Sequence, residues 1–149
     1  MPNARLLRSC AAIEKGSLPA QNSALNALMS ISFDNASNCL RIARTPGMIQ
    51  CLLNGLRTGT DDSRDGASGV LCNVIYYNKE AARLVLGCDN VLAMLNGLCK
   101  SRDTWSAYLG VSVLEACCHQ EQAVRDFPSS LHSTPGLPWP RRALASDLP

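Results

Sequence analysis

Residues that could perform chemistry are sparse in this chain. Its two histidines, His119 and His132, have no Cys, Asp or Ser partner at the spacing of a catalytic triad or a metal site. The phosphate-binding patterns GxGxxG and GxxxxGK[ST] do not occur. The acidic stretch GTDDSRDG (residues 59–66) lacks the length and the closing glutamate of a calcium-binding loop, so we interpret it as a loop followed by a helix cap. We therefore predict no enzymatic activity, no metal site and no cofactor.

Eight cysteines form no CxxC pair and no Cys/His cluster with zinc spacing. Four of them fall where a helix would bury an apolar side chain, and an unpaired cysteine in such a place behaves as a small hydrophobic residue. These four are Cys51, Cys72, Cys99 and Cys117. We predict reduced, buried thiols rather than disulfides or metal ligands. Such thiols favour a cytoplasmic or nuclear location.

Length and charge exclude several classes of protein. A chain of 149 residues is long enough for one domain with a sizeable core. Its net charge of +2 gives no strong field toward nucleic acid or anionic membranes, and no run of about 18 apolar residues occurs. Arg5 and Arg8, with no acidic residue before Glu14, are compatible with a transit peptide. We favour a helix that carries two solvated arginines.

Helices must position any site in this chain, and their pattern repeats. The letters LNGL at residues 53–56 return 42 residues later at 95–98. Upstream the best offset is 43, which aligns residues 24–31 with 67–74 and then with 110–117. A period near 42 is typical of helical solenoid repeats. We interpret Gly55 and Gly97, which are costly inside helices, as points where stacked helices approach closely.

Each repeat is predicted to contain three helices. Apolar residues at 67, 70, 71, 74 and 75 follow the i, i+3, i+4, i+7, i+8 spacing of one helix face. Thr45, Pro46 and Gly47 interrupt the pattern, while Asn35, Asn78 and the segment 61–63 offer N-cap side chains. The predicted helices cover residues 35–44, 48–58 and 63–76 in one unit, and 78–87, 90–100 and 104–119 in the next.

This three-helix pattern resembles the armadillo repeat. The resemblance is carried by GASGVLCNVIYYNKEAARLV, residues 66–85, and by RTPGMIQCLLNGL, residues 44–56. It covers roughly residues 4–127 and implies an all-α, right-handed armadillo-like α-solenoid of about two and a half repeats. HEAT-type repeats are close neighbours of this pattern. One departure is Gly87, which stands three residues before the second helix rather than at its turn.

The resemblance also implies a binding site. Peptide-binding armadillo proteins line a concave groove with an asparagine of the third helix, which here is Asn73. Nuclear-import receptors of this family add a tryptophan one turn earlier, where this chain has Gly69. We therefore do not expect a nuclear-import receptor. The candidate partner-binding residues are Asn26, Ser30, Asn73 and Tyr77, with Asn73 facing the ligand. The alternative for Asn73 is an asparagine near the C-terminal end of its helix that bonds only locally or to water.

Two regions complete the prediction. Residues 1–127 form the helical repeat domain, and the proline-rich residues 128–149 form a disordered tail. Neither end of the array has an obvious polar cap, so we expect a fragment of a longer array or a degenerate copy, with self-association through the ends as an option. The predicted function is a protein-interaction module that presents a concave groove to a protein or extended peptide. The alternative is a structural spacer without a ligand. Neither nucleic acid nor membrane is an expected partner.

Overall fold

The computed structural model describes residues 3–120, and every regular element in that range is an α-helix. The all-α prediction is therefore confirmed, whereas His132 and the predicted tail at 128–149 lie outside the described residues. The helices are α1 (Ala4–Lys15), α2 (Leu18–Ser32), α3 (Ala36–Arg44), α4 (Met48–Thr58), α5 (Asp61–Tyr77), α6 (Lys79–Leu86), α7 (Val91–Cys99) and α8 (Thr104–Gln120).

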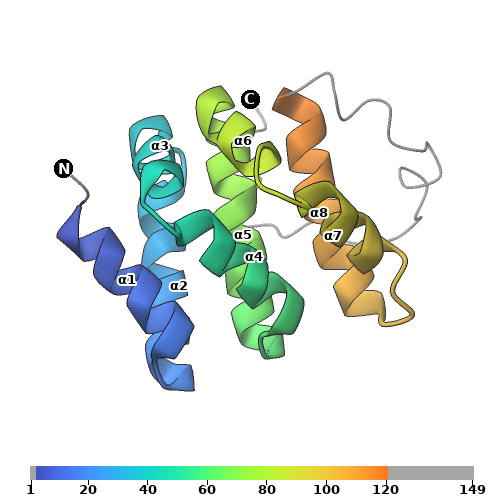
Figure 1. Cartoon of the computed structure of the whole chain (residues 1–149), viewed down its shortest axis with the longest axis horizontal. Coiled ribbons are helices and arrows are strands. Elements are labelled where there is room, and N and C mark those ends of the chain that lie inside the picture. The colour runs from blue at the N-terminus through green and yellow to red at the C-terminus, as the bar shows by residue number, and fades with distance from the viewer. Residues whose placement is uncertain (1–2, 121–149) are drawn as a thin grey trace.

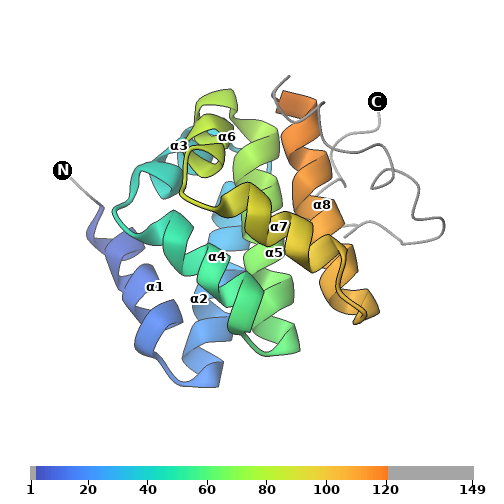
Figure 2. The ribbon, with the colours of Figure 1, turned by 45° about the vertical axis from the view of Figure 1, so that its right-hand side comes forward.

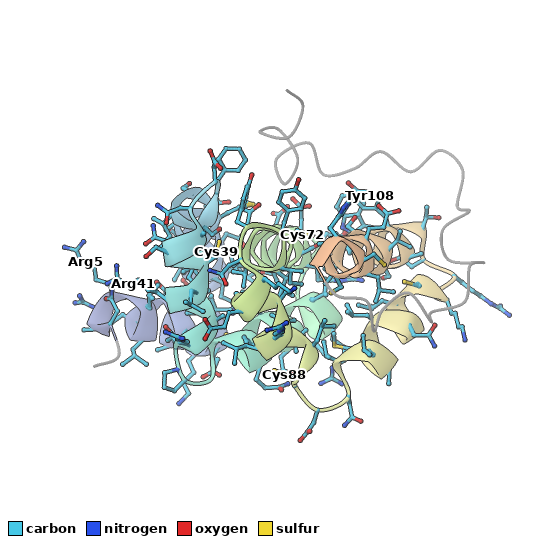
Figure 3. All side chains as sticks on the ribbon, turned by 90° about the horizontal axis from the view of Figure 1, so that it is seen from above. Arg5, Cys39, Arg41, Cys72, Cys88 and Tyr108 are labelled. Carbon is cyan, nitrogen blue, oxygen red and sulfur yellow. The ribbon has the colours of Figure 1, made fainter. Side chains whose placement is uncertain are left out.

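The helices form two rows. Helices α2, α5 and α8 pack side by side and run in the same direction (Figure 1). Helices α1, α4 and α7 make the second row, and each packs on the helix that follows it, α2, α5 or α8 (Figure 2). The short helices α3 and α6 pack on each other and on α5 and α8, respectively. A view from above shows α2, α5 and α8 together on one side of the molecule (Figure 3).

The predicted helix boundaries agree closely with the observed ones, and the caps explain most of them. Asn35 Oδ1 accepts a hydrogen bond from the backbone N–H of Asn38 at 2.9 Å, and Asn78 Oδ1 accepts one from Ala81 at 3.0 Å. Both satisfy an N–H group that has no partner within its helix. The cap of α5 is Thr60 rather than a residue of the predicted segment 61–63, so α5 begins earlier than expected.

One left-handed residue precedes each of the helices α4 and α7. Gly47 has φ +76°, and Asn90 has φ +61°. Glycine and asparagine are the residues that adopt this conformation most readily. The turn position at which the repeat pattern has a glycine is therefore taken by Asn90, and Gly87, which stands three residues before the helix, has ordinary right-handed geometry.

The core is centred on α5, in which every residue from 66 to 75 is buried. Val70, Leu71, Val74 and Ile75 are all fully buried. This helix packs on α2 at one side, on α8 at the other and on α4 below, so almost its whole surface between Gly66 and Ile75 is covered. Burial on all sides explains why its sequence is apolar or small nearly throughout.

Polar contacts join equivalent positions of neighbouring units. Several hydrogen bonds connect residues that are 41 or 42 positions apart, which matches the period of the sequence repeat. The pairs are Ser63 with Asn22, Asn73 with Ser32, Asn78 with Ala36, and Arg64 with Ser106. The exposed ion pair of Arg44 with Glu80 also joins two units.

The glycines of the repeated LNGL do not mark close contacts between stacked units, so that interpretation is wrong. A Cβ atom on Gly55 would lie an ordinary 3.6 Å from Ala67 Cβ of α5, and one on Gly97 would meet nothing within 4 Å. A close approach exists instead at Gly110 of α8. A Cβ atom there would lie 2.8 Å from Leu98 Cβ and 3.0 Å from the backbone nitrogen of Cys99.

No single helix among residues 3–120 is long and apolar enough to cross a membrane. Helices α6 and α7 together reach the necessary length and hydropathy, but they are bent by 87° relative to each other.

Candidate protein-binding face

Asn73 does not face an open groove, so the prediction that it contacts a ligand directly is wrong for this structure. Its side chain is only 1% exposed. The amide Nδ2 donates hydrogen bonds to the carbonyl oxygen of Met29 at 3.3 Å and to Ser32 Oγ at 3.2 Å. Both acceptors belong to α2. Asn73 therefore links two neighbouring helices of the same row, a role that differs both from ligand contact and from the local bonding considered as its alternative.

The neighbouring position is closed as well. A Cβ atom on Gly69 would lie 2.5 Å from Met29 Sδ, so the Met29 side chain lies directly over this glycine. This is where import receptors of the armadillo family carry tryptophan. The space that an aromatic side chain would occupy is thus filled by α2, and Gly69 permits the close contact of α2 with α5.

Asn26 and Ser30 are exposed on α2. Ser30 Oγ donates a hydrogen bond to the carbonyl oxygen of Asn26 at 2.9 Å, a bond within the helix. In the repeat register the two residues are equivalent to Gly69 and Asn73, which contact the preceding helix of their row. No described helix precedes α2 in that row. Asn26 and Ser30 therefore lie on its open side, and the structure does not bring them together with Asn73.

Tyr77 belongs to a row of four aromatic rings at the C-terminal ends of α2, α5 and α8. Phe33 and Tyr77 have ring centroids 5.9 Å apart, Tyr77 and Tyr76 are 5.2 Å apart, and Tyr76 and His119 are 5.8 Å apart. All three contacts are edge-to-face, which is a favourable arrangement for aromatic pairs. We call Phe33, Tyr77, Tyr76 and His119 the aromatic row.

The aromatic row is accessible from solvent. Phe33 is 37% exposed, His119 is exposed, and both tyrosines are half-buried. The three helix ends that carry it lie at the same edge of the molecule (Figure 1). Tyrosine is one of the residues enriched among those that contribute most of the binding energy at protein interfaces.

The sequence contained a signal for this row that the motif search missed. Phe33, Tyr76 and His119 are spaced by 43 residues, the offset that aligns the helices of this row. Each unit thus contributes one ring at the same position. Tyr77, the residue that was predicted, is the neighbour that connects Phe33 to Tyr76.

The cysteines are all unpaired, as expected, but their burial differs from the prediction at one position. Cys51, Cys72 and Cys117 are buried, whereas Cys99 is only partly buried. Burial raises the pKa of Cys72 and Cys117 to about 12, so both thiols are protonated and unreactive at neutral pH. Figure 3 shows Cys72 among the helices and Cys88 near the edge of the molecule.

The comparisons with known proteins identify no relative. No protein-family model matches the chain, no curated protein matches it, and no solved structure matches it.

Proposed function

We propose that the chain is an armadillo-like α-solenoid and that it binds an extended segment of another protein along the aromatic row. The solenoid is supported by the packing of α2, α5 and α8 in one row. Two shorter helices connect each of these helices to the next, α3 and α4 between α2 and α5, and α6 and α7 between α5 and α8. The observation that carries the binding function is the ring present once per unit at a spacing of 43 residues.

A row of rings suits an extended peptide for geometric reasons. Successive rings are 5.2 to 5.9 Å apart. Alternate side chains of a β-strand, which point to the same side, are about 6.6 to 7 Å apart. Because the rings touch edge to face and leave no gap between them, apolar side chains on one side of a bound strand would pack across the exposed ring surfaces of the row. The proposed contacts are made by Phe33, Tyr77 and Tyr76, while Asn26 and Ser30 on the open side of α2 remain candidates for polar contacts with the same partner.

Peptide selection tests this proposal. A random-peptide library is selected on the full chain, and the Kd of the enriched peptides is measured by fluorescence anisotropy for the wild type and for Phe33→Ala and Tyr77→Ala. We expect each variant to weaken binding by about 1 to 2 kcal/mol, roughly five- to thirtyfold, as for an aromatic residue at the centre of an interface.

Leu84→Ala is the matched control. Leu84 is 39% exposed, which is close to the value for Phe33, but it lies on α6 outside the aromatic row. Its replacement should leave the Kd unchanged. Selected peptides that bind equally well to Phe33→Ala and Tyr77→Ala would rule out the aromatic row as the binding site.

The second candidate function is a structural spacer, and a specific observation favours it. Asn73 and Gly69, the two positions that the armadillo resemblance assigns to a peptide groove, are both occupied by contacts with α2. If the spacer function is right, the library should yield no enriched peptide. Phe33→Ala and Tyr77→Ala should then change only the thermal stability, because the rings would serve to pack one unit on the next.

A further inference from the structure

A cavity and a cluster of metal-ligating atoms lie next to each other between α1 and α4, away from the aromatic row. The cavity has a volume of about 480 Å³ and is lined by α1, α2, α4 and the start of α5. Its wall includes Glu14 and Cys51. The Sγ atoms of Cys10 and Cys51 and a carboxylate oxygen of Glu14 all lie within 4.8 Å of one another.

The stacking of the repeat brings these three residues together. Cys10 on α1 and Cys51 on α4 are 41 positions apart, and the two helices pack against each other in the second row. Cys51 Sγ donates a hydrogen bond to the carbonyl oxygen of Cys10 at 3.7 Å. Glu14 follows Cys10 by four residues, so the two side chains share one face of α1.

We propose that Cys10, Cys51 and Glu14 form a binding site for a single thiophilic divalent cation, with Zn²⁺ as the natural choice. Two thiolates and one carboxylate are ligands that Zn²⁺ accepts, and three protein ligands leave the fourth tetrahedral position to water. The cavity supplies room for that water, since Glu14 and Cys51 belong to its wall.

The geometry requires only a small adjustment. With Zn–S bonds of about 2.3 Å, the two sulfur atoms of a tetrahedral site lie about 3.8 Å apart. The observed separations of no more than 4.8 Å are thus within about 1 Å of those in a metal site. Glu14 is exposed, so its side chain has room to turn toward the two sulfur atoms.

Binding of the cation is coupled to the release of protons from the two thiols. In the metal-free protein both thiols carry their protons, and binding of the cation replaces these two protons, which pass to solvent. Glu14 enters the site as a carboxylate and releases no proton. No oxidation or reduction takes place. The bound cation also joins α1 to α4 and so holds the first two units together.

Metal titration tests the site. The full chain is purified with a non-thiol reductant, freed of metal with a chelator and titrated with Co²⁺. We expect one equivalent to bind with the near-ultraviolet absorption of thiolate-to-cobalt charge transfer, and Zn²⁺ should then displace Co²⁺. Proton release measured in weakly buffered solution should approach two protons per cation.

Three variants locate the ligands. Cys51→Ser should abolish the charge-transfer band or reduce it to that of a single thiolate. Glu14→Gln, a change on an exposed side chain that should not affect folding, should weaken Co²⁺ affinity at least about tenfold. Cys88→Ser is the control, because Cys88 is a half-buried thiol outside the cluster, and it should bind Co²⁺ like the wild type.

Several outcomes would overturn the proposal. One is the absence of stoichiometric binding by the wild type. Another is unchanged affinity in Glu14→Gln, which would exclude the carboxylate as a ligand even if the cysteine variants failed to fold. A third is equal loss of binding in Cys88→Ser, which would indicate scattered thiols rather than this cluster. A disulfide between Cys10 and Cys51 in the reduced preparation would likewise exclude the site.

Discussion

Helices α2 and α5 occupy equivalent positions in the repeat, yet their surroundings differ. Positions 24, 27, 28 and 31 of α2 align with 67, 70, 71 and 74 of α5. In α5 all four residues are buried, whereas in α2 Ala27 is exposed and Ile31 is 43% exposed. The repeat register thus aligns apolar positions of the two helices, but the neighbouring helices decide which of these positions are buried.

The largest expected difference between the two helices concerns their apolar side chains. Leu71→Ala in α5 should lower the free energy of unfolding by about 2 to 5 kcal/mol, because it leaves a cavity in a fully buried site. Ile31→Ala in α2 should cost no more than about 0.5 kcal/mol. Urea unfolding followed by circular dichroism measures both. Equal losses would show that α2 is covered in solution by something beyond the described residues.

The closed position over Gly69 gives the second test. Gly69→Leu should lower the free energy of unfolding by about 1 to 3 kcal/mol, because the new side chain must displace Met29 from between the helices. Asn26→Leu introduces the same side chain at the equivalent, exposed position of α2 and should change stability by less than about 0.5 kcal/mol. If Gly69→Leu is tolerated as well as Asn26→Leu, the contact of α2 with α5 is looser than the structure indicates.

Asn73 and Ser30 form the third pair. Asn73→Ala should cost about 1 to 2 kcal/mol, since it removes two hydrogen bonds to α2 and leaves the Met29 carbonyl with one donor fewer. Ser30→Ala removes only a bond within α2 and should be close to neutral. Thermal melts under identical conditions compare the two. An Asn73→Ala protein as stable as the wild type would restore Asn73 as a candidate for direct ligand contact.

The smallest effect is expected at the repeated LNGL. Gly97→Ala should raise the free energy of unfolding by about 0.5 to 1 kcal/mol, because alanine is the better helix former and a Cβ atom there meets nothing. Gly110→Ala is its counterpart and should lower stability, since the Cβ atom would crowd the Leu98 side chain and the Cys99 backbone. Chemical denaturation measures the change in the free energy of unfolding of both variants. Stabilisation by Gly110→Ala would contradict the close packing of α7 on α8.

The sequence was sufficient to predict the helices because periodicity, caps and turn residues are local properties. Asn35 and Asn78 cap the helices that they were expected to cap, and the interruption at residues 45–47 separates α3 from α4. The repeat period also predicted which helices are equivalent. The caps and turns depend on residues close in the chain, and the repeat is visible in the letters themselves, so neither required knowledge of the packed structure.

The environment of single polar residues could not be predicted in the same way. Asn73 is compatible with a groove or with a buried contact, and the choice depends on the carbonyl oxygen of Met29 and the hydroxyl of Ser32, 44 and 41 residues away. Gly97 looked like a packing requirement because the letters around it recur, but its surroundings are open. The aromatic row and the cluster of Cys10 with Cys51 were accessible to sequence reasoning only through residues that are one period apart.

The bonds of Ser63 with Asn22 and of Asn73 with Ser32 also bear on the mechanics of the chain. Ten residues of α5 separate Ser63 from Asn73, which places the two bonds about 15 Å apart along the helix axis. With a single bond, α2 could rotate over α5 about that one contact. With two bonds at that distance, rotation of α2 relative to α5 in either direction must stretch at least one of them. The two bonds therefore oppose rotation of the first unit relative to the second, which neither could do alone.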